Sequence, residues 1–331
     1  MASKLKENVF LFYRKFLISS YGRVFRYRIK SSYLFGLLYP YENTIKIQDS
    51  KMYVNIFEKD PSLRNTFRAY ALNLIHEKET TELFKNEVKE GNIVIDMGAN
   101  IGYFSLLAAK LVGKKGKVYS FEPEPRNFSY LNKNIELNKY TNVSAFQKAV
   151  SDKPGSVKLY ICPYDTGHHT INQFEGIEKY NPKLSGLKKD FVEVESIVLD
   201  HFLSQQKQKI DVIKMDIEGA EFLALSGMDR IIKENNNLKM FIEFFPLLIK
   251  EMGGSPEAFI RTLLNEYKFT IFLIPGDYNA SNKKLIKMNS YEEIMGFCKD
   301  EKDHVNLFLK KNDDKEDEEL FLESAHKSYI K

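Results

Sequence analysis

The sequence predicts an α/β protein built on a doubly wound, mostly parallel β-sheet. Short apolar runs alternate with amphipathic helical patterns, as expected for consecutive βαβ units. The predicted core strands lie at residues 93–96, 118–121, 143–150, 212–215 and 240–244. The first strand ends in an acid and a glycine-punctuated turn, and the second ends in another acid roughly 20 residues later, which is typical of a nucleotide-binding βαβ unit.

Residues 1–42 are expected to form a basic amphipathic N-terminal arm. Eight Lys or Arg side chains stand against the single acid Glu7 in the first thirty residues. Apolar or aromatic side chains recur every four residues, at Val9, Tyr13, Leu17 and Tyr21. A helix with this pattern either docks one face on the domain or contacts a membrane surface peripherally through residues 1–30. The apolar run at 33–39 is far shorter than the ~20 residues that span a bilayer.

Residues 43–90 are predicted to lead into the core as a β-hairpin followed by helix. Apolar and polar residues alternate from 43 to 56 around a short turn, which predicts the hairpin. The stretch 61–88 has a helical pattern. The main domain is then expected at residues 91–310, and the mixed charge run at 311–331 is expected to be a solvated tail.

The composition is that of a globular protein. The chain has 331 residues, of which 43% are hydrophobic and 28% charged, so it can bury a substantial core. Cys162 and Cys298 are its only cysteines, and their spacing suits neither a zinc site nor a disulfide framework. A reducing cytoplasm is therefore the expected location. The net charge of +4 falls short of that of a dedicated nucleic-acid-binding protein, so no nucleic-acid partner is expected.

The turn after the first core strand is typical of a site for a nucleoside without a phosphate cradle. Glycines let the backbone approach a ligand closely, and the next helix presents unpaired N–H groups at its start. The spacing is Asp-x-Gly-x-x-x-Gly, and no Lys-Ser/Thr pair follows, which disfavours NAD and ATP. Glu122 ends the second strand where a carboxylate accepts hydrogen bonds from ribose hydroxyls. These features indicate S-adenosylmethionine as the cofactor and therefore a methyltransferase.

Three motifs in order resemble those of the FkbM-type family of class I S-adenosylmethionine-dependent methyltransferases. They are Val94–Phe104 (VIDMGANIGYF), Ser120–Pro125 (SFEPEP) and Val212–Glu221 (VIKMDIEGAE), with weaker support from residues 148–152. The resemblance covers roughly residues 75–275 at βα-unit spacing. It implies a Rossmann-like, seven-stranded sheet that strands at 270–274 and 305–309 complete, the last one antiparallel. It also implies methyl transfer to oxygen, commonly to a sugar hydroxyl in a glycan, glycolipid or natural product.

Residues of the glycine turn and of the next two strand ends are the predicted cofactor site. Asp96 is expected to organise the turn and to reach the methionine ammonium group. Gly98 and Gly102 allow close backbone approach, while Asn100 and Tyr103 line the methionine end. Three residues that follow the third strand are candidates for the adenine contact, with no choice among them: Val150, Ser151 and Asp152.

The end of the fourth strand carries the densest group of charges. Lys214, Asp216 and Glu218 alternate as the strand ends, and a buried Lys or Asp costs free energy unless it is paired. Asp216 is the preferred active-site acid, and the alternative is a purely structural ion pair. Glu243 ends the fifth strand and could bind an acceptor hydroxyl.

A sugar hydroxyl is a poor nucleophile at neutral pH, so a general base is expected within hydrogen-bond reach. His168, His169 and Asp216 are the candidates. The two histidines lie in a segment, 155–189, that is too long and irregular for a simple crossover and is expected to shape the substrate side. Alternatively the carboxylates could hold Mg2+, which would acidify the hydroxyl. One strand end gives this little support, so no metal is predicted.

Two other functions stay open. The basic arm favours an RNA methyltransferase, but residues 216–219 (DIEG) oppose it, because base-amine methylation commonly uses an Asn- or Asp-Pro-Pro-aromatic turn. A noncatalytic, membrane-associated scaffold could retain the same fold. No motif specifies the acceptor or the oligomeric state.

Overall fold

A computed structural model describes residues 43–71, 76–163, 166–171, 190–205, 209–275 and 284–311. The predicted arm at 1–42, the tail beyond residue 311 and residues 172–189 of the expected insertion lie outside the described residues. The docking of the arm and its membrane contact therefore stay predictions. None of the described helices is both long enough and apolar enough to cross a membrane.

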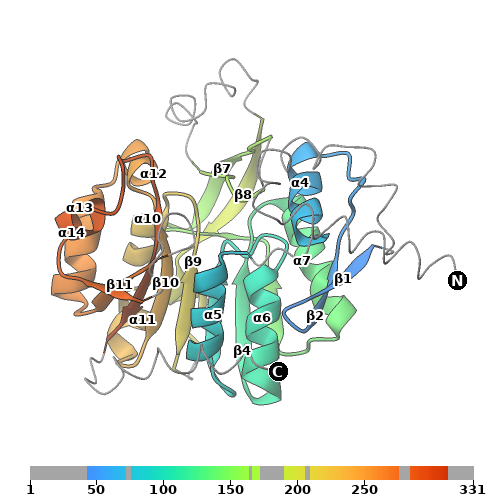
Figure 1. Ribbon diagram of the computed structural model, residues 1–331, viewed down its shortest axis with the longest axis horizontal. Coiled ribbons are helices and arrows are strands. Elements are labelled where there is room, and N and C mark those ends of the chain that lie inside the picture. The colour runs from blue at the N-terminus through green and yellow to red at the C-terminus, as the bar shows by residue number, and fades with distance from the viewer. Residues whose placement is uncertain are drawn as a thin grey trace, which may run out of the picture.

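The predicted doubly wound, mostly parallel sheet is confirmed (Figure 1). Its eight strands, in their order across the sheet, are β12 (Ile286–Met288), β11 (Thr270–Ile274), β13 (Val305–Lys310), β10 (Lys239–Phe244), β9 (Val212–Met215), β3 (Ile93–Met97), β4 (Lys117–Phe121) and β5 (Val143–Phe146). Strand β13 runs antiparallel to both of its neighbours, as expected. The predicted number of seven strands is wrong by one, because β12 adds an antiparallel edge strand beside β11.

Helices cover both faces of the sheet. One face carries α4 (Pro61–Ala71), α5 (Lys78–Glu87), α6 (Tyr103–Val112), the turn η1 (Gly113–Lys115) and α7 (Pro125–Asn138). The other carries α9 (Leu199–Phe202), α10 (Glu221–Ser226), α11 (Asp229–Glu234), α12 (Pro246–Glu251), α13 (Pro256–Arg261), the π-helical turn η3 (Thr262–Glu266) and α14 (Tyr291–Met295).

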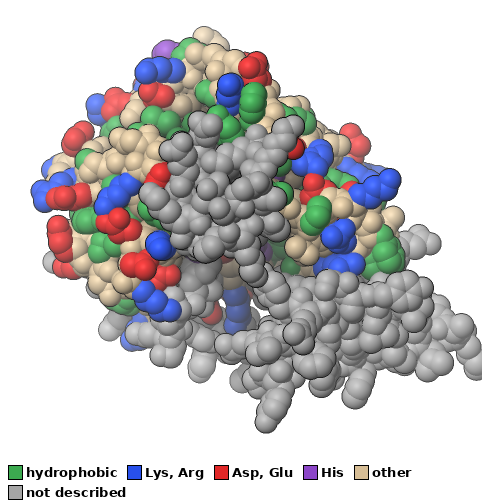
Figure 2. Space-filling model, turned by 90° about the horizontal axis from the view of Figure 1, so that it is seen from above, with side chains coloured by type: hydrophobic (Ala, Val, Ile, Leu, Met, Phe, Trp, Pro, Cys, Tyr) green, Lys and Arg blue, Asp and Glu red, His purple; other side chains and the backbone are tan. Residues whose placement is uncertain are grey.

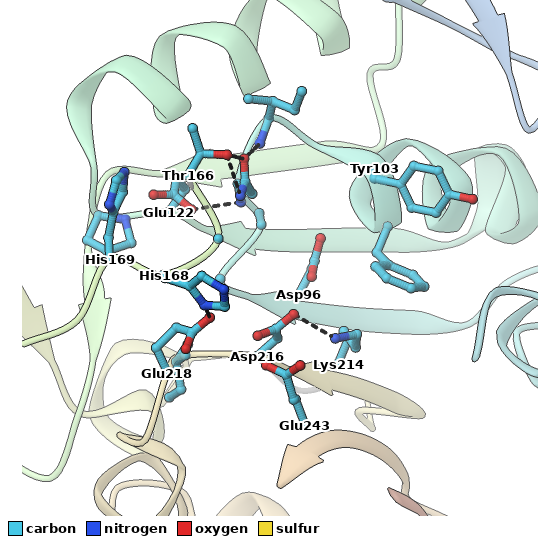
Figure 3. A pocket seen from close by; sticks show the side chains of 18 of the residues that line it. Asp96, Tyr103, Glu122, Thr166, His168, His169, Lys214, Asp216, Glu218 and Glu243 are labelled. Atoms are coloured by element: carbon cyan, nitrogen blue, oxygen red, sulfur yellow. Dashed lines mark hydrogen bonds and ion pairs between the residues drawn. The ribbon is translucent and has the colours of Figure 1, made fainter. Parts of the chain in front are cut away.

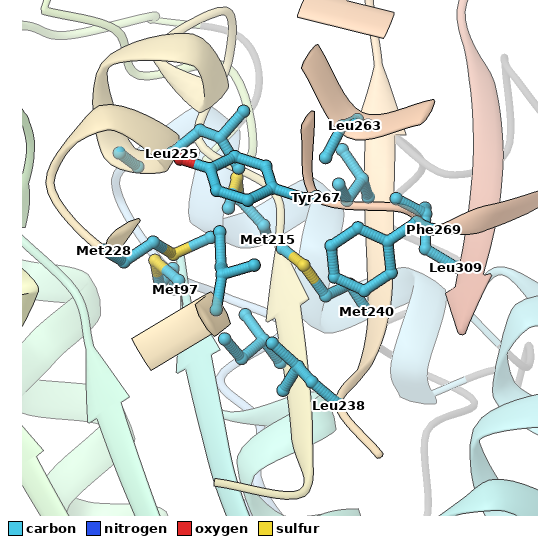
Figure 4. Packing of buried hydrophobic residues seen from close by; sticks show 14 of the residues in the cluster. Met97, Met215, Leu225, Met228, Leu238, Met240, Leu263, Tyr267, Phe269 and Leu309 are labelled. Carbon is cyan, nitrogen blue, oxygen red and sulfur yellow. The ribbon is translucent and has the colours of Figure 1, made fainter. Parts of the chain in front are cut away.

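Successive side chains of the central strands pack into two different cores. Val94 belongs to the cluster under α4 to α7, whereas Ile95 and Met97 belong to the cluster under α9 to α14 (Figure 4). Strands that are buried on both faces need apolar residues at every position, which explains why the predicted core strands read as continuous apolar runs.

The stretch 61–88, predicted to be helical, contains α4 and α5, and the turn before α5 holds Glu77 in the left-handed region with φ 39°. One predicted strand differs from the structure. The predicted third strand, 143–150, is split, because only β5 stays in the main sheet. Its continuation, β6 (Ala149–Val150), joins a small sheet in the order β6-β8-β7, with β7 at Gly155–Tyr160 and β8 at Phe191–Ile197. The predicted insertion therefore begins as a β-ribbon above the main sheet (Figure 1).

The hairpin predicted at 43–56 is confirmed as β1 (Thr44–Ile47) and β2 (Ser50–Tyr53). Two asparagines of α7 attach it to the domain. Asn134 Oδ1 accepts the Tyr53 N–H at 2.7 Å, and Asn138 Oδ1 accepts the Lys51 N–H at 2.7 Å. The hairpin thereby holds the chain that leads into α4, which forms one wall of the cavity described below.

We expect Leu309→Ala to lower the free energy of unfolding by about 2–5 kcal/mol, because a fully buried side chain of the second core is replaced by a cavity (Figure 4). The chain contains no tryptophan, so urea unfolding followed by far-UV circular dichroism is the suitable measurement. The control is Phe57→Ala, which removes a side chain that is 67% exposed. Equal losses in the two variants would contradict the packing described here.

Candidate active site

A cavity of about 520 Å³ lies at the carboxyl ends of β3, β4, β9 and β10, where ligands bind in open α/β sheets. Helix α4, the turn at 76–77 and residues 166–171 also line it. The cavity thus spans two regions: the glycine turn with the ends of β4 and β6, and the polar ends of β9 and β10 (Figure 3). Its volume suits a small-molecule ligand, for which roughly 300–1,000 Å³ is usual.

Asp96 ends β3 inside this cavity and organises the start of α6. Its carboxylate accepts a hydrogen bond from the Ser105 hydroxyl at 2.5 Å. Burial raises the pKa of Asp96 to about 6, although the Ser105 bond lowers it. The structure therefore places Asp96 against the first turn of α6, and its organisation of the glycine turn and its contact with a methionine ammonium group both stay predictions.

The first glycine of the turn, Gly98, packs against the backbone at the end of β9. Gly98 has φ 81°, and a Cβ at this position would lie 1.8 Å from the carbonyl oxygen of Asp216. The Asp216 N–H in turn donates to Met97 O at 3.1 Å. A side chain at 98 would push these two segments apart, so the turn requires glycine here for packing as well as for its dihedral angles.

The second half of the turn is held by its own side chains. Gly102 has φ 102° and directly precedes α6. Asn100 also adopts a left-handed conformation, and its Oδ1 accepts the Ile101 N–H at 2.8 Å. Its Nδ2 lies 3.3 Å from the Thr166 hydroxyl, which connects the turn to the segment above it (Figure 3).

Tyr103 lines the cavity with its ring, but its hydroxyl is directed away from it. The hydroxyl lies 3.3 Å from both Thr81 Oγ1 and Gln48 Nε2. The ring stacks on Tyr70 of α4 with centroids 5.6 Å apart and an interplanar angle of 9°. Any contact of Tyr103 with a ligand would therefore use the ring rather than the hydroxyl.

Glu122 lies in the cavity beside the glycine turn. Its Oε2 accepts the Asn100 N–H at 2.7 Å, and its Oε1 accepts the Glu124 N–H at 2.9 Å. Burial raises the pKa of Glu122 to about 8, while these two backbone donors lower it. Each oxygen of a carboxylate has a second lone pair, so the group can still accept hydroxyl donors from a ligand.

An apolar slot adjoins Glu122. Among the three candidates for the adenine contact, Val150 lines the cavity, and Ser151 and Asp152 are not among the described residues that line it. The Ser151 N–H donates to Ile197 O at 2.9 Å, within the small sheet. The remaining apolar walls of the slot are Phe121, Pro123, Leu159 and Ile171.

Lys214 is the buried cation of the acidic strand end. Only 2% of its side chain is exposed, and its Nζ lies 3.1 Å from Asp216 Oδ2 and 3.8 Å from Glu77 Oε2. The Phe104 ring centroid is 5.0 Å away. Burial alone would lower the pKa of Lys214, but the two carboxylates raise it, so the amine stays charged. The structure therefore provides the partner that a buried lysine requires.

Sequence reasoning did not identify Glu77. Its side chain is 5% exposed, and its Oε1 lies 3.1 Å from His76 Nε2. Asn306 Nδ2 donates to its other oxygen at 3.2 Å. Although burial acts to raise it, the net pKa of Glu77 is lowered, chiefly by the charge of Lys214. Nothing in the local sequence distinguishes this residue from an ordinary acid on a helix surface.

Three carboxyl groups gather where the acceptor site was predicted. Asp216, Glu218 and Glu243 bring oxygens within 4.8 Å of one another (Figure 3). Burial, together with the charges of the other two acids, raises the pKa of Glu243 well above its usual range. This geometry could also hold a divalent cation, so the Mg2+ alternative draws ligands from two strand ends rather than one.

Glu221, at the start of α10, holds the loop after β9 through hydrogen bonds to its backbone. Its Oε1 accepts the N–H groups of Ile217 and Gly219, at 3.1 and 3.3 Å. Glu221 is not among the described residues that line the cavity, and burial raises its pKa to about 8. It holds the backbone that presents Asp216 and Glu218.

The adjacent histidines make different contacts. His168 Nδ1 lies 2.9 Å from Glu218 Oε1, so a neutral ring that donates from Nδ1 leaves Nε2 able to accept a proton. His169 Nδ1 accepts the Cys162 N–H at 3.0 Å, which leaves its proton on Nε2. The arrangement therefore favours His168 as the general base. His304, which sequence reasoning missed, lies with Nε2 3.6 Å from Glu243 Oε1, and burial lowers its pKa.

One known protein family matches the part of the chain that contains most of the residues lining the cavity. The family model described as the Methyltransferase FkbM domain matches residues 96–271, from the acid that ends β3 into β11. This range contains the glycine turn, Glu122, His168 and His169, and the cluster of three carboxyl groups.

Individual relatives share between a quarter and a third of their residues with this chain over the matched stretch. Methyltransferase 1 of Beauveria bassiana is 29% identical over 150 residues, which cover 42% of this chain and 59% of that protein. The hexuronic acid methyltransferase AglP of Haloferax volcanii is 25% identical over 196 residues, or 59% of this chain and 70% of that protein. A crystal structure of the methyltransferase FkbM from Methylobacillus flagellatus matches 76% of this chain and 55% of its own, at 15% identity and a TM-score of 0.36. The chain thus spans about three fifths of the length of relatives such as the first.

We expect the free energy of unfolding of the original chain to fall, relative to that of Glu122→Gln, as pH rises from about 5 to about 8.5. The pKa of Glu122 is raised from 4.5 to about 8, so between these values the folded state holds a proton that the unfolded state has released. Stability then falls as pH rises through this window, and a glutamine removes that dependence. Urea midpoints of the ligand-free proteins at several pH values test this, and a pH-independent difference would refute the assignment.

Proposed function

Because the chain belongs to the FkbM family of S-adenosylmethionine-dependent methyltransferases, we propose that it methylates a hydroxyl group of a sugar in a glycan, glycolipid or natural product. The observation that carries this proposal is a cavity among the described residues in which the glycine turn and Glu122 adjoin a His–carboxylate pair. A hydroxyl acceptor needs such a pair, because its proton must be removed as the methyl group arrives.

The part of the cavity at the glycine turn and the ends of β4 and β6, which we call the cofactor half, would bind the ribose, the adenine and the ammonium group of S-adenosylmethionine through different residues. Glu122 would accept the ribose hydroxyls, and the slot around Val150 would take the adenine. Asp96 would hold the ammonium group, with Gly98 allowing close approach of the backbone. When bound, the cofactor supplies an electrophilic methyl group on a sulfonium centre.

The remaining residues would position and deprotonate the acceptor. His168 takes the hydroxyl proton on Nε2, and the Glu218 carboxylate stabilises the resulting imidazolium. Asp216 and Glu243 would form hydrogen bonds that orient the hydroxyl. Lys214 forms an ion pair with Asp216. Much of the rate is expected to come from this positioning.

The two alternative functions predict different surfaces and ligands. Viewed from above, from the side on which β7 and β8 lie, the described surface has Lys and Arg intermixed with Asp and Glu (Figure 2). An RNA methyltransferase would be favoured by a continuous basic face instead. A noncatalytic scaffold would not need to bind the cofactor. Mass spectrometry of glycans and lipids from a deletion strain, searching for the loss of one methyl group, would identify the acceptor.

We expect Glu122→Ala to weaken binding of S-adenosylhomocysteine by about 1.5–3 kcal/mol at about pH 9, where Glu122 is ionised, because it removes a charged acceptor of ribose hydrogen bonds. Isothermal titration calorimetry measures this directly. Glu234→Ala, which removes an exposed acid of α11, is the control and should bind like the original chain. An unchanged affinity in the Glu122 variant would refute the ribose assignment.

We expect His168→Gln and Asp216→Asn each to lower turnover on the order of 100-fold or more while affinity for S-adenosylhomocysteine stays the same. Both changes preserve approximate size and remove a proton acceptor or a charge. His201→Gln, at an exposed position of α9, is the matched control.

Chelation separates direct action from metal binding in the same assay. Activity that survives EDTA supports His168 and Asp216 acting themselves, whereas activity lost to EDTA and restored by Mg2+ assigns the three-carboxyl cluster to an ion. Near-normal turnover of Asp216→Asn would make this acid structural.

A further inference from the structure

His168, the proposed base, lies between two buried threonines of the same short segment, Thr166 and Thr170. The Thr170 hydroxyl donates a hydrogen bond to Glu218 O at 3.1 Å. The backbone of Thr170 pairs with that of Tyr160, at the end of β7, through hydrogen bonds of 2.8 and 3.3 Å. One end of the segment is thus held by the residue whose carboxylate contacts His168. The place of the imidazole ring then also depends on what holds Thr166.

A chain of polar groups holds the Thr166 end. Thr166 Oγ1 lies 3.3 Å from Asn100 Nδ2 and 3.1 Å from Thr66 Oγ1. Thr66 Oγ1 lies in turn 3.3 Å from Ser62 O. A hydroxyl group can donate one hydrogen bond and accept another, so these distances allow one continuous chain from the glycine turn, through Thr166, into helix α4.

This chain connects three parts of the molecule that are distant in the sequence. Asn100 belongs to the glycine turn, and Thr66 belongs to α4, which precedes the range matched by the family model. The carbonyl oxygen of Thr166 also accepts a hydrogen bond from Asn127 of α7 at 3.3 Å. A buried polar network of this kind rigidifies the backbone that takes part in it. Residue 166 is therefore held on both its side chain and its backbone.

From these contacts, and resting on the proposed function, we propose that Thr166 is a positioning residue for the methyl transfer. Its hydroxyl group holds the segment so that His168 keeps Nδ1 against Glu218 and leaves Nε2 to take the acceptor proton. In the reaction the acceptor oxygen gains the methyl group and loses its proton to Nε2, while the sulfonium becomes a neutral thioether. Thr166 exchanges no atom in this step. It contributes because a small displacement of the base lowers the rate.

The first test reads the His168 ring without turnover. In the full-length protein labelled with 15N-histidine, ring nitrogen chemical shifts report the tautomer, and His168→Gln identifies the His168 signals among those of six histidines. Thr166→Val keeps the approximate shape and removes the hydroxyl. We expect it to increase the share of the tautomer protonated on Nε2, because the contact with Glu218 that selects Nδ1 is loosened. Thr166→Ser should restore the original signals, and Thr141→Val, at an exposed position, should leave them unchanged.

The second test measures the rate of methyl transfer. Isotope-labelled S-adenosylmethionine at saturation and the glycan and lipid extract of a deletion strain are the substrates. We expect Thr166→Val to transfer the label roughly tenfold more slowly and Thr166→Ser to stay close to the original chain. Because Thr166 acts through His168, adding Thr166→Val to His168→Gln should cause no further loss. Thr66→Val removes the same contact from the α4 side and should reproduce both results.

The outcomes separate positioning from a general structural role. Unchanged His168 signals in Thr166→Val, or a loss of rate that is equally large in the His168→Gln background, would overturn the proposal and leave the methyltransferase function intact. Calorimetry with S-adenosylhomocysteine shows that each variant is folded. An original chain that transfers no methyl group to the extract would overturn the proposed function, and this proposal with it.

Discussion

The buried ammonium group of Lys214 is the interaction on which the site depends. It joins Asp216 at the end of its own strand to Glu77, which comes from the turn between α4 and α5. Glu77 in turn accepts a hydrogen bond from Asn306 of β13. Removing one partner from a buried ion pair leaves an uncompensated charge, which commonly costs about 3–5 kcal/mol. One cation therefore connects three separate segments at this end of the cavity, and its charge lowers the pKa of Glu77.

The segment 166–171 couples the two halves of the cavity. Thr166 is buried, contacts Asn100 of the glycine turn and accepts a hydrogen bond on its carbonyl oxygen from Asn127 of α7. Two residues later, His168 contacts Glu218 at the end of β9. A short stretch of chain thus contacts both the glycine turn and Glu218, the carboxylate partner of the proposed base.

The sequence was sufficient for features that depend on local pattern. Continuous apolar runs located the core strands, and the glycine spacing and Glu122 located residues that line the cavity. Glu77 and His304 were not predictable in the same way, since they reach the cavity from a turn read as helix and from the residue before the last strand. The difference between His168 and His169 also depends on tertiary contacts, because neighbouring residues of one type carry no local signal for which of them meets a carboxylate.

The contact between Gly98 and residue 216 separates two evolutionary constraints. The glycine is required by the carbonyl oxygen of Asp216, a backbone atom that every amino acid supplies. The side chain of Asp216 lines the cavity and takes no part in that contact. The need for glycine at 98 would therefore persist whatever side chain stands at 216, although loss of the acid would deprive buried Lys214 of one of its partners. The backbone packing of the glycine turn is thus a separate requirement from the chemistry of the side chain at 216.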